Sequence, residues 1–282
     1  MAHHKRTIYI SDLDGTLLDE NSKISSRTAT ILNQLIGEGM LFSIATARTP
    51  ATVVDLMKDV NIQLPAILMT GALVYDIAQD KYLSVSSFPH EVASQITGAV
   101  SDCGISPMIY HIENSRLCVT YRSPLTKQQH SFIDERNGTP YKKYIEVKDT
   151  LAAPDVTIMI FFMGQYEQLE KIYSTIAAIE GHCSYLYRDS MQPEQGYLEI
   201  YPCGTSKAAA IRQLANITHA DEVVVFGDNI NDIPMFEVAQ RSYAMANAVD
   251  AAKGKATATI ASNTEDGVAQ FLLDEFGRNI AQ

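Results

Sequence analysis

No stretch of the sequence approaches the roughly 18 to 20 uninterrupted apolar residues that a membrane-spanning helix needs. Residues Met1 to Arg6 lead directly into a predicted strand, without the apolar segment of a signal peptide. These two absences argue against a membrane protein and against a secreted one. We therefore expect a cytoplasmic protein with no membrane partner.

Cysteines are few, and their spacing matches no known cysteine motif. None of the four, Cys103, Cys118, Cys183 and Cys203, belongs to a Cys-x-x-Cys pair of the kind found in zinc and redox sites. Disulfides persist mainly in secreted proteins. We therefore expect four reduced cysteines with structural roles.

Basic residues are outnumbered, since 22 lysines and arginines face 33 aspartates and glutamates, which gives a formal net charge of −11. A protein that binds a nucleic-acid backbone needs a basic surface, so the charge argues against nucleic acid as a partner. A small phosphate ester remains compatible with this charge if local cations outweigh the overall field. The sequence predicts no oligomeric state.

Two aspartates, Asp12 and Asp14, follow an apolar strand and precede Gly15. Residues i and i+2 of an extended chain point the same way, so both carboxylates are expected to face one pocket until the chain turns. One would remain ionised as a nucleophile or metal ligand, and the other would carry a proton to and from a leaving group. The alternative is an ordinary turn, because Asp and Gly are common turn residues.

A second acidic loop follows the β-branched run 223–226. Such a run is typical of a buried parallel strand, and in open α/β sheets ligands bind outside the carboxyl ends of the strands. Asp228 and Asp232 are therefore expected on the same rim as the first two aspartates. Four clustered carboxylates repel one another unless a cation is bound, and their oxygens suit Mg²⁺. Helix capping is the alternative explanation for Asp228, Asn231 and Asp232.

Two further segments carry a hydroxyl group and positive charges. The predicted strand 41–46 ends at Thr46, and Arg48 lies just beyond it. Lys207 is expected in the first turn of a helix, where a lysine opposes the helix dipole. Taken singly, Lys207 would be a surface residue and Thr46 a strand-end hydroxyl. Beside four carboxylates and a phosphate, however, Lys207 becomes a counter-charge.

The chain is long for one domain and suits two, with 282 residues of which 46% are hydrophobic. It has no internal repeats, no low-complexity linker and no coiled-coil heptads. Strands and helices alternate at both ends, which indicates a parallel sheet with right-handed crossovers. The elements expected there are strands 7–13, 41–46, 66–70 and 222–226 and helices 25–38, 51–59, 207–216, 232–239 and 265–276.

The middle of the chain has a different, α+β character. The elements expected there are helices 91–102, 127–135 and 166–180 and strands 108–112, 116–121, 156–163, 184–188 and 197–201. Because the acidic loops on either side of this insert must meet, the core is expected to be discontinuous. The predicted domains are a core of residues 1–83 and 204–282 and a cap of residues 84–203.

Six segments together carry a resemblance to a known family: Asp12-Leu13-Asp14-Gly15-Thr16, Ala45-Thr46-Ala47-Arg48, Ser206-Lys207, Gly227-Asp228-Asn229-Ile230-Asn231-Asp232, Ala244-Met245-Ala246-Asn247-Ala248 and Glu265-Asp266-Gly267-Val268. The chain resembles the haloacid dehalogenase-like (HAD) phosphohydrolases, and within them the Cof-type sugar-phosphate phosphatases with a type IIB cap. The resemblance implies an α/β fold, with a Rossmann-like parallel-sheet core and an inserted α+β cap of type C2B.

The resemblance also implies Mg²⁺-dependent hydrolysis of a small phosphorylated metabolite, such as a sugar phosphate, through an aspartyl-phosphate. It makes Asp12 the nucleophile and Asp14 the general acid and base. It places Thr46 and Lys207 on the phosphate, and assigns Mg²⁺ to Asp12, the backbone carbonyl of Asp14, and Asp228. Arg48 is a further phosphate-binding candidate, because local cations must outweigh the overall negative charge. Asn231 and Asp232 fall in the supporting shell.

The chain departs from the family pattern at Ala47 and Ala246, where relatives usually carry glycine, and at Thr70, where they carry asparagine. These departures bear on the substrate more than on the reaction. Gly71, Asn247 and Arg188 are candidate substrate contacts. Further cap candidates, each of which is otherwise a surface or packing residue, are Tyr110, His111, Asp189 and Glu199.

Two alternative functions share the same motifs. One is a phosphomutase with the same core, which must protect its aspartyl-phosphate from water. The other is a non-catalytic phosphate-binding or regulatory module, such as a phospho-acceptor receiver. A receiver needs neither the acid Asp14 nor a cap of this size, so the sequence favours a hydrolase.

Overall fold

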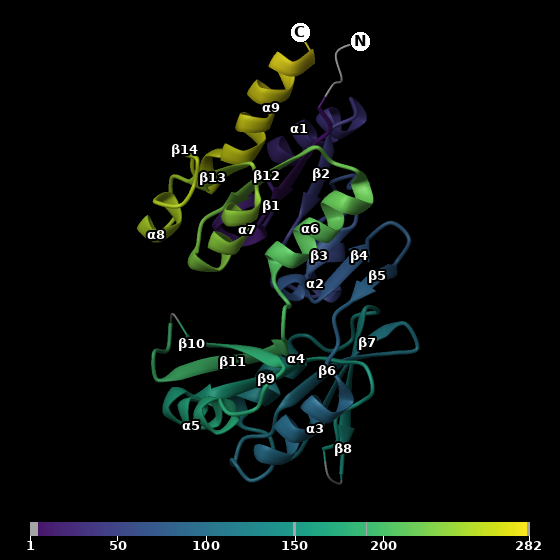
Figure 1. The fold of residues 1–282 in the computed structure, drawn as a ribbon, viewed down its shortest axis with the longest axis vertical. Helices are drawn as coiled ribbons and strands as arrows, with labels where there is room; N and C mark the ends of the chain where they lie inside the picture. Colours follow the sequence, from purple (N-terminus) through teal and green to yellow (C-terminus); the bar gives the residue numbers. More distant parts are fainter. Residues whose placement is uncertain (1–4, 149–150, 190, 281–282) are drawn as a thin grey trace. The chain divides into compact units, whose positions relative to one another are not determined.

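The structure is a computed structural model that describes residues 5–148, 151–189 and 191–280 (Figure 1). The chain forms two compact units, one of Met1–Ser84 with Ser206–Gln282 and one of Val85–Thr205. We call them the core unit and the cap unit. The cap unit interrupts the core unit in the sequence.

The core unit is built on a five-stranded sheet in the order β14-β13-β12-β1-β2, in which all neighbours run parallel. Its strands are β1 (Thr7–Ser11), β2 (Leu41–Ile44), β12 (Glu222–Gly227), β13 (Arg241–Met245) and β14 (Ala258–Ile260). β1 and β12 pair with Ile10 opposite Val225, and both residues are fully buried. Because the two strands run in the same direction, the acidic loops that follow them emerge at one edge of the sheet.

Helices connect the strands of the core unit: α1 (Ser26–Gly37), α2 (Pro50–Leu56), α6 (Lys207–Thr218), α7 (Ile233–Val238), α8 (Asp250–Lys253) and α9 (Gly267–Ile280). α1 packs against α9, and α6 packs against α7. The Ser25 hydroxyl caps α1 by accepting from the Thr28 N–H. Asp266 in turn accepts from both the Ser25 and Thr28 hydroxyls, at 2.5 and 2.9 Å. Asp266 therefore ties the start of α1 to the segment before α9.

A small sheet of β3 (Ala66–Leu68), β4 (Leu73–Asp76) and β5 (Lys81–Val85) also precedes the cap unit in the sequence. The strand predicted through Thr70 is wrong in its last two residues. Met69, Thr70 and Gly71 have positive φ values of 49°, 57° and 95°, which end the strand in a tight 3₁₀ turn. This turn lies beside the start of α6.

The cap unit contains a six-stranded sheet in the order β10-β11-β9-β6-β7-β8. Its strands are β6 (Met108–Glu113), β7 (Arg116–Arg122), β8 (Lys142–Val147), β9 (Thr157–Gln165), β10 (His182–Arg188) and β11 (Gln195–Pro202), and its helices are α3 (His90–Ala99), α4 (Lys127–Asp134) and α5 (Tyr166–Ile176). Apolar side chains of one sheet face, including Ile160, Phe162 and Leu198, form a core with residues of α3 and α5. Alternate residues, such as Tyr197 and Glu199, belong to the opposite face.

The predicted α/β core with an α+β insert is confirmed, and most predicted elements are present. Five strands were not predicted, namely β4, β5, β8, β13 and β14. β8 carries three charged residues in six, and β14 is only three residues long, so neither presents a clear apolar alternation. The last predicted helix begins at Gly267 instead of at residue 265, because a short 3₁₀ turn (Asn263–Glu265) precedes it.

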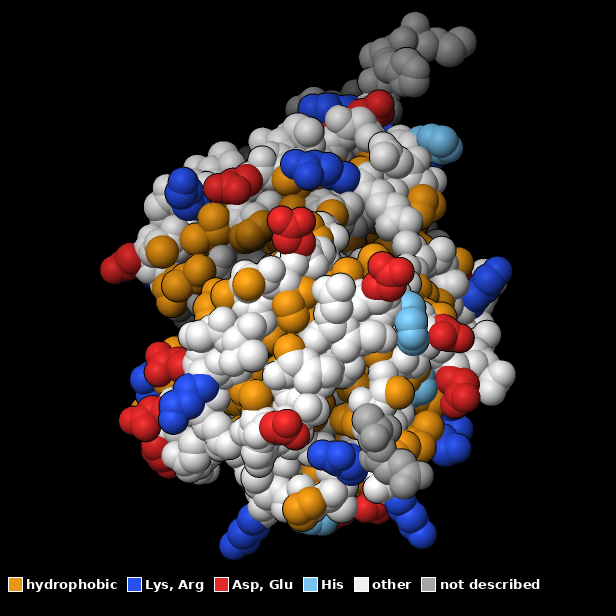
Figure 2. Space-filling view, turned by 60° about the horizontal axis from the view of Figure 1, so that its bottom comes forward, with side chains coloured by type: hydrophobic (Ala, Val, Ile, Leu, Met, Phe, Trp, Pro, Cys, Tyr) orange, Lys and Arg blue, Asp and Glu red, His pale blue; other side chains and the backbone are white. Residues whose placement is uncertain are grey.

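Among the described residues, no helix combines the length and the apolarity needed to cross a membrane. On the face drawn in Figure 2, acidic and basic side chains are interspersed with hydrophobic ones.

Candidate active site

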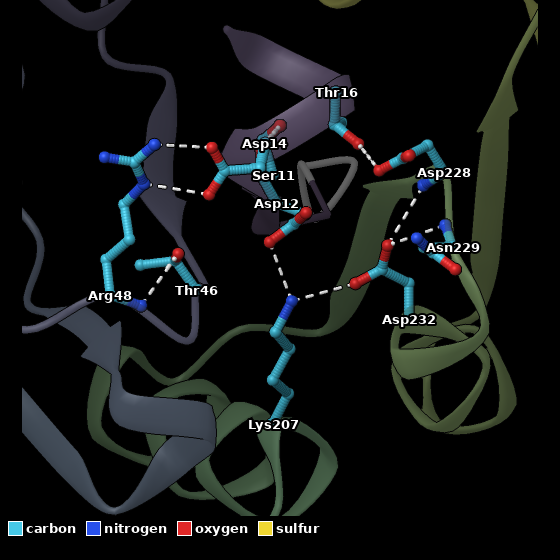
Figure 3. A network of polar contacts seen from close by, with 10 residues as sticks. All are labelled: Ser11, Asp12, Asp14, Thr16, Thr46, Arg48, Lys207, Asp228, Asn229 and Asp232. Atoms are coloured by element: carbon cyan, nitrogen blue, oxygen red, sulfur yellow. Dashed lines mark hydrogen bonds and ion pairs between the residues drawn. The ribbon is translucent and has the colours of Figure 1, made fainter. Parts of the chain in front are cut away.

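A buried ion pair between Asp12 and Lys207 lies at the centre of the site (Figure 3). Asp12 directly follows β1, and its backbone N–H continues the ladder by donating to the Phe226 carbonyl at 2.9 Å. Lys207 is the first residue of α6, which the Ser206 hydroxyl caps. The Lys207 ammonium donates to Asp12 Oδ1 at 2.7 Å and to Asp232 Oδ1 at 2.8 Å. One cation thus holds two carboxylates that come from different loops.

Burial dominates the electrostatics of Asp12. It raises the pKa of this carboxyl to about 7, and although the Lys207 charge opposes the shift, the Asp232 charge adds to it. Burial alone would lower the pKa of Lys207, but the neighbouring Asp12 and Asp232 carboxylates outweigh it and raise that pKa above its ordinary value. Lys207 is therefore a permanent positive charge beside Asp12.

Asp228 completes an acidic cluster with Asp12 and Asp232. One carboxylate oxygen of each lies within 4.8 Å of the others. Burial raises the pKa of Asp228 to about 6, against the effect of a 2.9 Å hydrogen bond from the Thr16 hydroxyl. The close approach requires a glycine at position 15, since a Cβ on Gly15 would lie 2.4 Å from an Asp228 carboxylate oxygen. Hard oxygen donors at this spacing fit a divalent cation such as Mg²⁺.

Asp232 organises the loop that carries Asp228. Its Oδ2 accepts the backbone N–H groups of Asp228 and Asn229 at 3.0 and 3.1 Å, while its Oδ1 accepts from Lys207. Asn229 caps the short 3₁₀ turn that follows, so the alternative that Asp228 itself is the cap is wrong. Asn231 is exposed. Asp232 therefore combines a capping role with an ion pair in the site.

Asp14 does not join the acidic cluster, although four clustered carboxylates were expected. Gly15 turns the chain with φ at 72°, and Figure 3 shows the Asp12 and Asp14 carboxylates aimed at different partners. Both Asp14 oxygens accept from Arg48, from Nε at 2.8 Å and from a terminal nitrogen at 2.6 Å. This partner raises the pKa of Arg48. The prediction that Arg48 binds phosphate stays a prediction, and the structure gives it Asp14 as a partner.

Thr46 and Gly71 border the site from the β2 side. The Thr46 hydroxyl is buried and accepts the Arg48 backbone N–H at 3.2 Å. Gly71 approaches the start of α6 so closely that a Cβ would lie 2.2 Å from the Ser206 carbonyl oxygen. The structure therefore places Gly71 as packing support for the residue that precedes Lys207.

Asn247 also contacts the turn Leu13–Leu17, which carries Asp14. Its side-chain N–H donates to the Gly15 carbonyl at 2.8 Å, and its oxygen accepts the Asn263 backbone N–H at 3.1 Å. Neither Asn263 nor Thr16 was predicted as a site residue. Their only signal was position, because Thr16 follows the two aspartates and Asn263 precedes the motif at Glu265.

The cap candidates have local partners within the cap unit. Arg188 lies 3.6 Å above the Tyr166 ring and donates to the Pro193 carbonyl at 2.7 Å. His111 is buried and hydrogen-bonds the Thr120 hydroxyl at 2.9 Å, as expected of a packing residue.

A second cap group surrounds Glu199. This carboxylate accepts from the Tyr187 and Tyr201 hydroxyls at 2.7 and 3.2 Å, and Asp189 accepts from the Tyr197 hydroxyl at 2.5 Å. Tyr110 is buried on the strand β6. These contacts form a tyrosine-rich polar cluster inside the cap unit.

Comparison with known proteins bears on the whole chain. The sequence pattern of the family described as haloacid dehalogenase-like hydrolase matches residues 9–272. The chain is 26% identical over 269 residues to the 5-amino-6-(5-phospho-D-ribitylamino)uracil phosphatase YitU of Bacillus subtilis, covering 94% of this chain and 96% of the relative. It is 24% identical over 272 residues to the pyridoxal phosphate phosphatase YbhA of Escherichia coli, covering 93% and 95% of the two chains.

Among solved structures, a HAD subclass IIB sugar phosphatase superposes with a TM-score of 0.73 at 22% identity. The superposition covers 96% of this chain and 99% of that one. It shows that the two chains share a fold.

Proposed function

The chain belongs to the haloacid dehalogenase-like hydrolase family and is a phosphoric monoester hydrolase, and from this premise we propose that it hydrolyses a small phosphorylated metabolite with Mg²⁺ through an aspartyl-phosphate on Asp12. The observation that carries the proposal is the buried Asp12 carboxylate, which Lys207 holds within reach of Asp228 and Asp232. A carboxylate in this environment is oriented, partly desolvated and next to a fixed positive charge.

In the first half of the reaction, an Asp12 oxygen would attack phosphorus while the bond from phosphorus to the leaving oxygen breaks. Asp14 would donate a proton to that oxygen. In the second half, Asp14 would take a proton from water, which attacks phosphorus and releases inorganic phosphate and the free Asp12 carboxylate.

Positive charge and hydrogen-bond donors would stabilise the transferring phosphoryl group. Lys207 supplies the charge, and the Thr46 hydroxyl supplies a donor. Asp12 and Asp228 would hold Mg²⁺, which neutralises phosphoryl charge when bound. Arg48 holds both Asp14 carboxylate oxygens and would orient the acid for proton transfer.

We further propose that the substrate is a sugar phosphate or a related small phosphomonoester. The relatives YitU and YbhA are named for a ribityl phosphate and for pyridoxal phosphate, which are both small phosphomonoesters. The net charge of −11 disfavours a polyanionic substrate such as nucleic acid.

A burst experiment with p-nitrophenyl phosphate tests the two aspartates separately, because its leaving group needs little protonation. Asp12→Asn should give neither a burst nor turnover. Asp14→Asn should still release about one equivalent of p-nitrophenol per enzyme and then stall, because no base activates water. Turnover by Asp12→Asn above about 1% of wild type would overturn the nucleophile assignment, since loss of a covalent nucleophile costs orders of magnitude.

Metal and substrate class are tested on the same protein. Wild-type activity should vanish in chelator and return with Mg²⁺. In a panel of sugar phosphates, pyridoxal phosphate and nucleotides, the highest kcat/KM should belong to a sugar or polyol phosphate. Full activity after dialysis against chelator would contradict the Mg²⁺ requirement. A product phosphorylated at another hydroxyl, instead of free phosphate, would indicate a phosphomutase.

A further inference from the structure

We propose that Asn247 is a positioning residue that braces the two acidic loops of the active site against each other. The inference rests on the proposed phosphatase function and gives Asn247 a role other than substrate contact. Its side-chain N–H donates to the Gly15 carbonyl at 2.8 Å, and its side-chain oxygen accepts the Asn263 N–H at 3.1 Å. The amide oxygen and one amide hydrogen are thus both engaged with backbone.

Asn263 adds a second contact at the end of the turn Leu13–Leu17. Its own side-chain N–H donates to the Leu18 carbonyl at 2.8 Å. Two asparagine amides therefore hold the carbonyls of Gly15 and Leu18, on either side of Thr16. The segment that follows Asp12 and Asp14 is anchored at two points by loops from the other end of the chain.

The loop that carries Asn247 also contacts the second acidic loop. Two residues further on, the Val249 backbone N–H donates to the Asp228 carbonyl at 2.9 Å. The segment 247–249 therefore holds Gly15 through a side chain and Asp228 through its backbone. It is a physical link between the two loops that lies outside the acidic cluster.

The two acidic loops are packed so closely that their spacing can change very little. Gly15 lies against the Asp228 carboxylate with no room for a methyl group, and the Thr16 hydroxyl donates to the same carboxylate at 2.9 Å. A shift of the turn moves Thr16 and Gly15 relative to Asp228, a member of the acidic cluster. Loss of a group that orients metal or catalytic residues typically costs about 10- to 100-fold in affinity or activity.

Two substitutions test the contact to Gly15. Asn247→Asp keeps the oxygen that accepts from Asn263 but removes the N–H that donates to the Gly15 carbonyl. Asn247→Ala removes both contacts without adding a charge near the acidic cluster. Both variants concern an exposed side chain, so the fold should be retained, which a thermal transition checks.

Asn33 provides a matched control in the core unit. Its side-chain N–H donates to the Asp59 carbonyl at 2.9 Å, and its oxygen accepts the Asn61 N–H at 2.7 Å. Asn33→Asp therefore removes the same kind of hydrogen bond from another exposed asparagine that bridges backbone groups. Asn33 differs from Asn247 in that neither of its partners, Asp59 and Asn61, belongs to an acidic loop of the site.

The experiment measures kcat and KM for p-nitrophenyl phosphate, and the Kd of Mg²⁺ alone by titration calorimetry. For Asn247→Ala and Asn247→Asp we expect kcat to fall by about 10-fold or more, with a smaller change in KM. For Asn247→Ala we also expect the Mg²⁺ Kd to rise by about 10-fold. Asn33→Asp should stay within about 2-fold of wild type in each quantity, as surface substitutions usually do.

Two results would contradict a bracing role for Asn247. One is a wild-type kcat and a wild-type Mg²⁺ Kd in both Asn247 variants, and the other is an equal loss of kcat and Mg²⁺ affinity in Asn33→Asp. Substrate contact by Asn247, the earlier expectation, would instead raise KM and leave the Mg²⁺ Kd unchanged. Failure of the proposed function is seen separately as an absence of Mg²⁺-dependent hydrolysis by the wild-type protein. In that case the calorimetric comparison still decides whether Asn247 sets the metal site.

Discussion

Arg48 and Asp14 form a two-pronged ion pair, in which Nε and a terminal nitrogen of the guanidinium lie 2.8 and 2.6 Å from the two carboxylate oxygens. The Asp14 side chain is 53% exposed. Asp12, two residues earlier, has Lys207 as its partner. The two aspartates of one short motif are thus held by different cations, which suits different tasks in one reaction.

Arg48→Lys should lower kcat by about 10-fold or more, because an ammonium keeps the charge but cannot hold both Asp14 oxygens in one plane. The inhibition constant of inorganic phosphate should change by less than about 2-fold, as for a surface change, because the guanidinium is engaged with Asp14. Steady-state kinetics with phosphate as inhibitor measure both quantities. Arg212→Lys, at an exposed position of α6, is the control.

A large rise in the phosphate inhibition constant would lead to another conclusion. It would place Arg48 on the phosphoryl group, as predicted from the need for local positive charge, and Asp14 would then need no orienting partner.

Affinity for Mg²⁺ should fall steeply on acidification. Burial raises the pKa of Asp12 to about 7 and that of Asp228 to about 6. Mg²⁺ binds the ionised carboxylates, so protonation below these values competes with the metal, and the Kd should rise as the pH falls from 8 to 5. At pH 6, binding should release protons, which makes the calorimetric enthalpy depend on the ionisation enthalpy of the buffer. A Kd that stays constant across this range would show that neither carboxylate holds the metal.

The arrangement of the main site loops could be predicted from sequence because it follows from strand direction. β1 and β12 are apolar and parallel, so the loops after them had to share an edge of the sheet. Lys207 could be placed in the first turn of a helix because Ser206 is a strong capping residue. The family was predicted from the resemblance of six motifs, and the fold from the alternation of strands and helices together with that resemblance; both are confirmed.

The partners of individual side chains could not be predicted in the same way. The direction of Asp14 depends on the chain leaving the extended conformation directly after Asp12, where the turn Leu13–Leu17 begins. Period-two reasoning assumes an extended chain. The partnership with Arg48 depends on the packing of β1 against β2. Asn247 lies in a loop, where no periodic pattern indicates which group an amide will contact.

Gly71→Ala should reduce kcat, because the added Cβ would collide with the Ser206 carbonyl at 2.2 Å and displace the start of α6, which carries Lys207. The free energy of unfolding should also fall by about 1 to 3 kcal/mol because of steric strain. Gly39→Ala is the matched control: Gly39 has a similar φ of 99°, but a Cβ there meets nothing within 4 Å. Urea denaturation and kcat are measured for both variants. Equal effects on kcat would mean that the loss reflects backbone strain and not the position of Lys207.

Lys142→Met should stabilise the protein at neutral pH. Lys142 is 3% exposed, and among the described residues no carboxylate lies within ion-pair distance of it. Burial, with a smaller contribution from Arg136, lowers the pKa of Lys142 to about 8. A depression of this size from 10.5 corresponds to about 3 kcal/mol.

The stabilisation expected from Lys142→Met depends on pH. Below pH 8 the lysine is charged in both states, so the folded state bears the full cost of burying the charge. As the pH rises from 8 toward 10.5, the folded lysine is neutral and the cost disappears. Lys142→Met should therefore raise the free energy of unfolding by about 1 to 3 kcal/mol at pH 7, and by much less at pH 10. Lys143→Met, at the exposed neighbouring position, should change stability little at either pH. A destabilised Lys142→Met variant at pH 7 would show that the buried ammonium makes a favourable interaction that outweighs its burial.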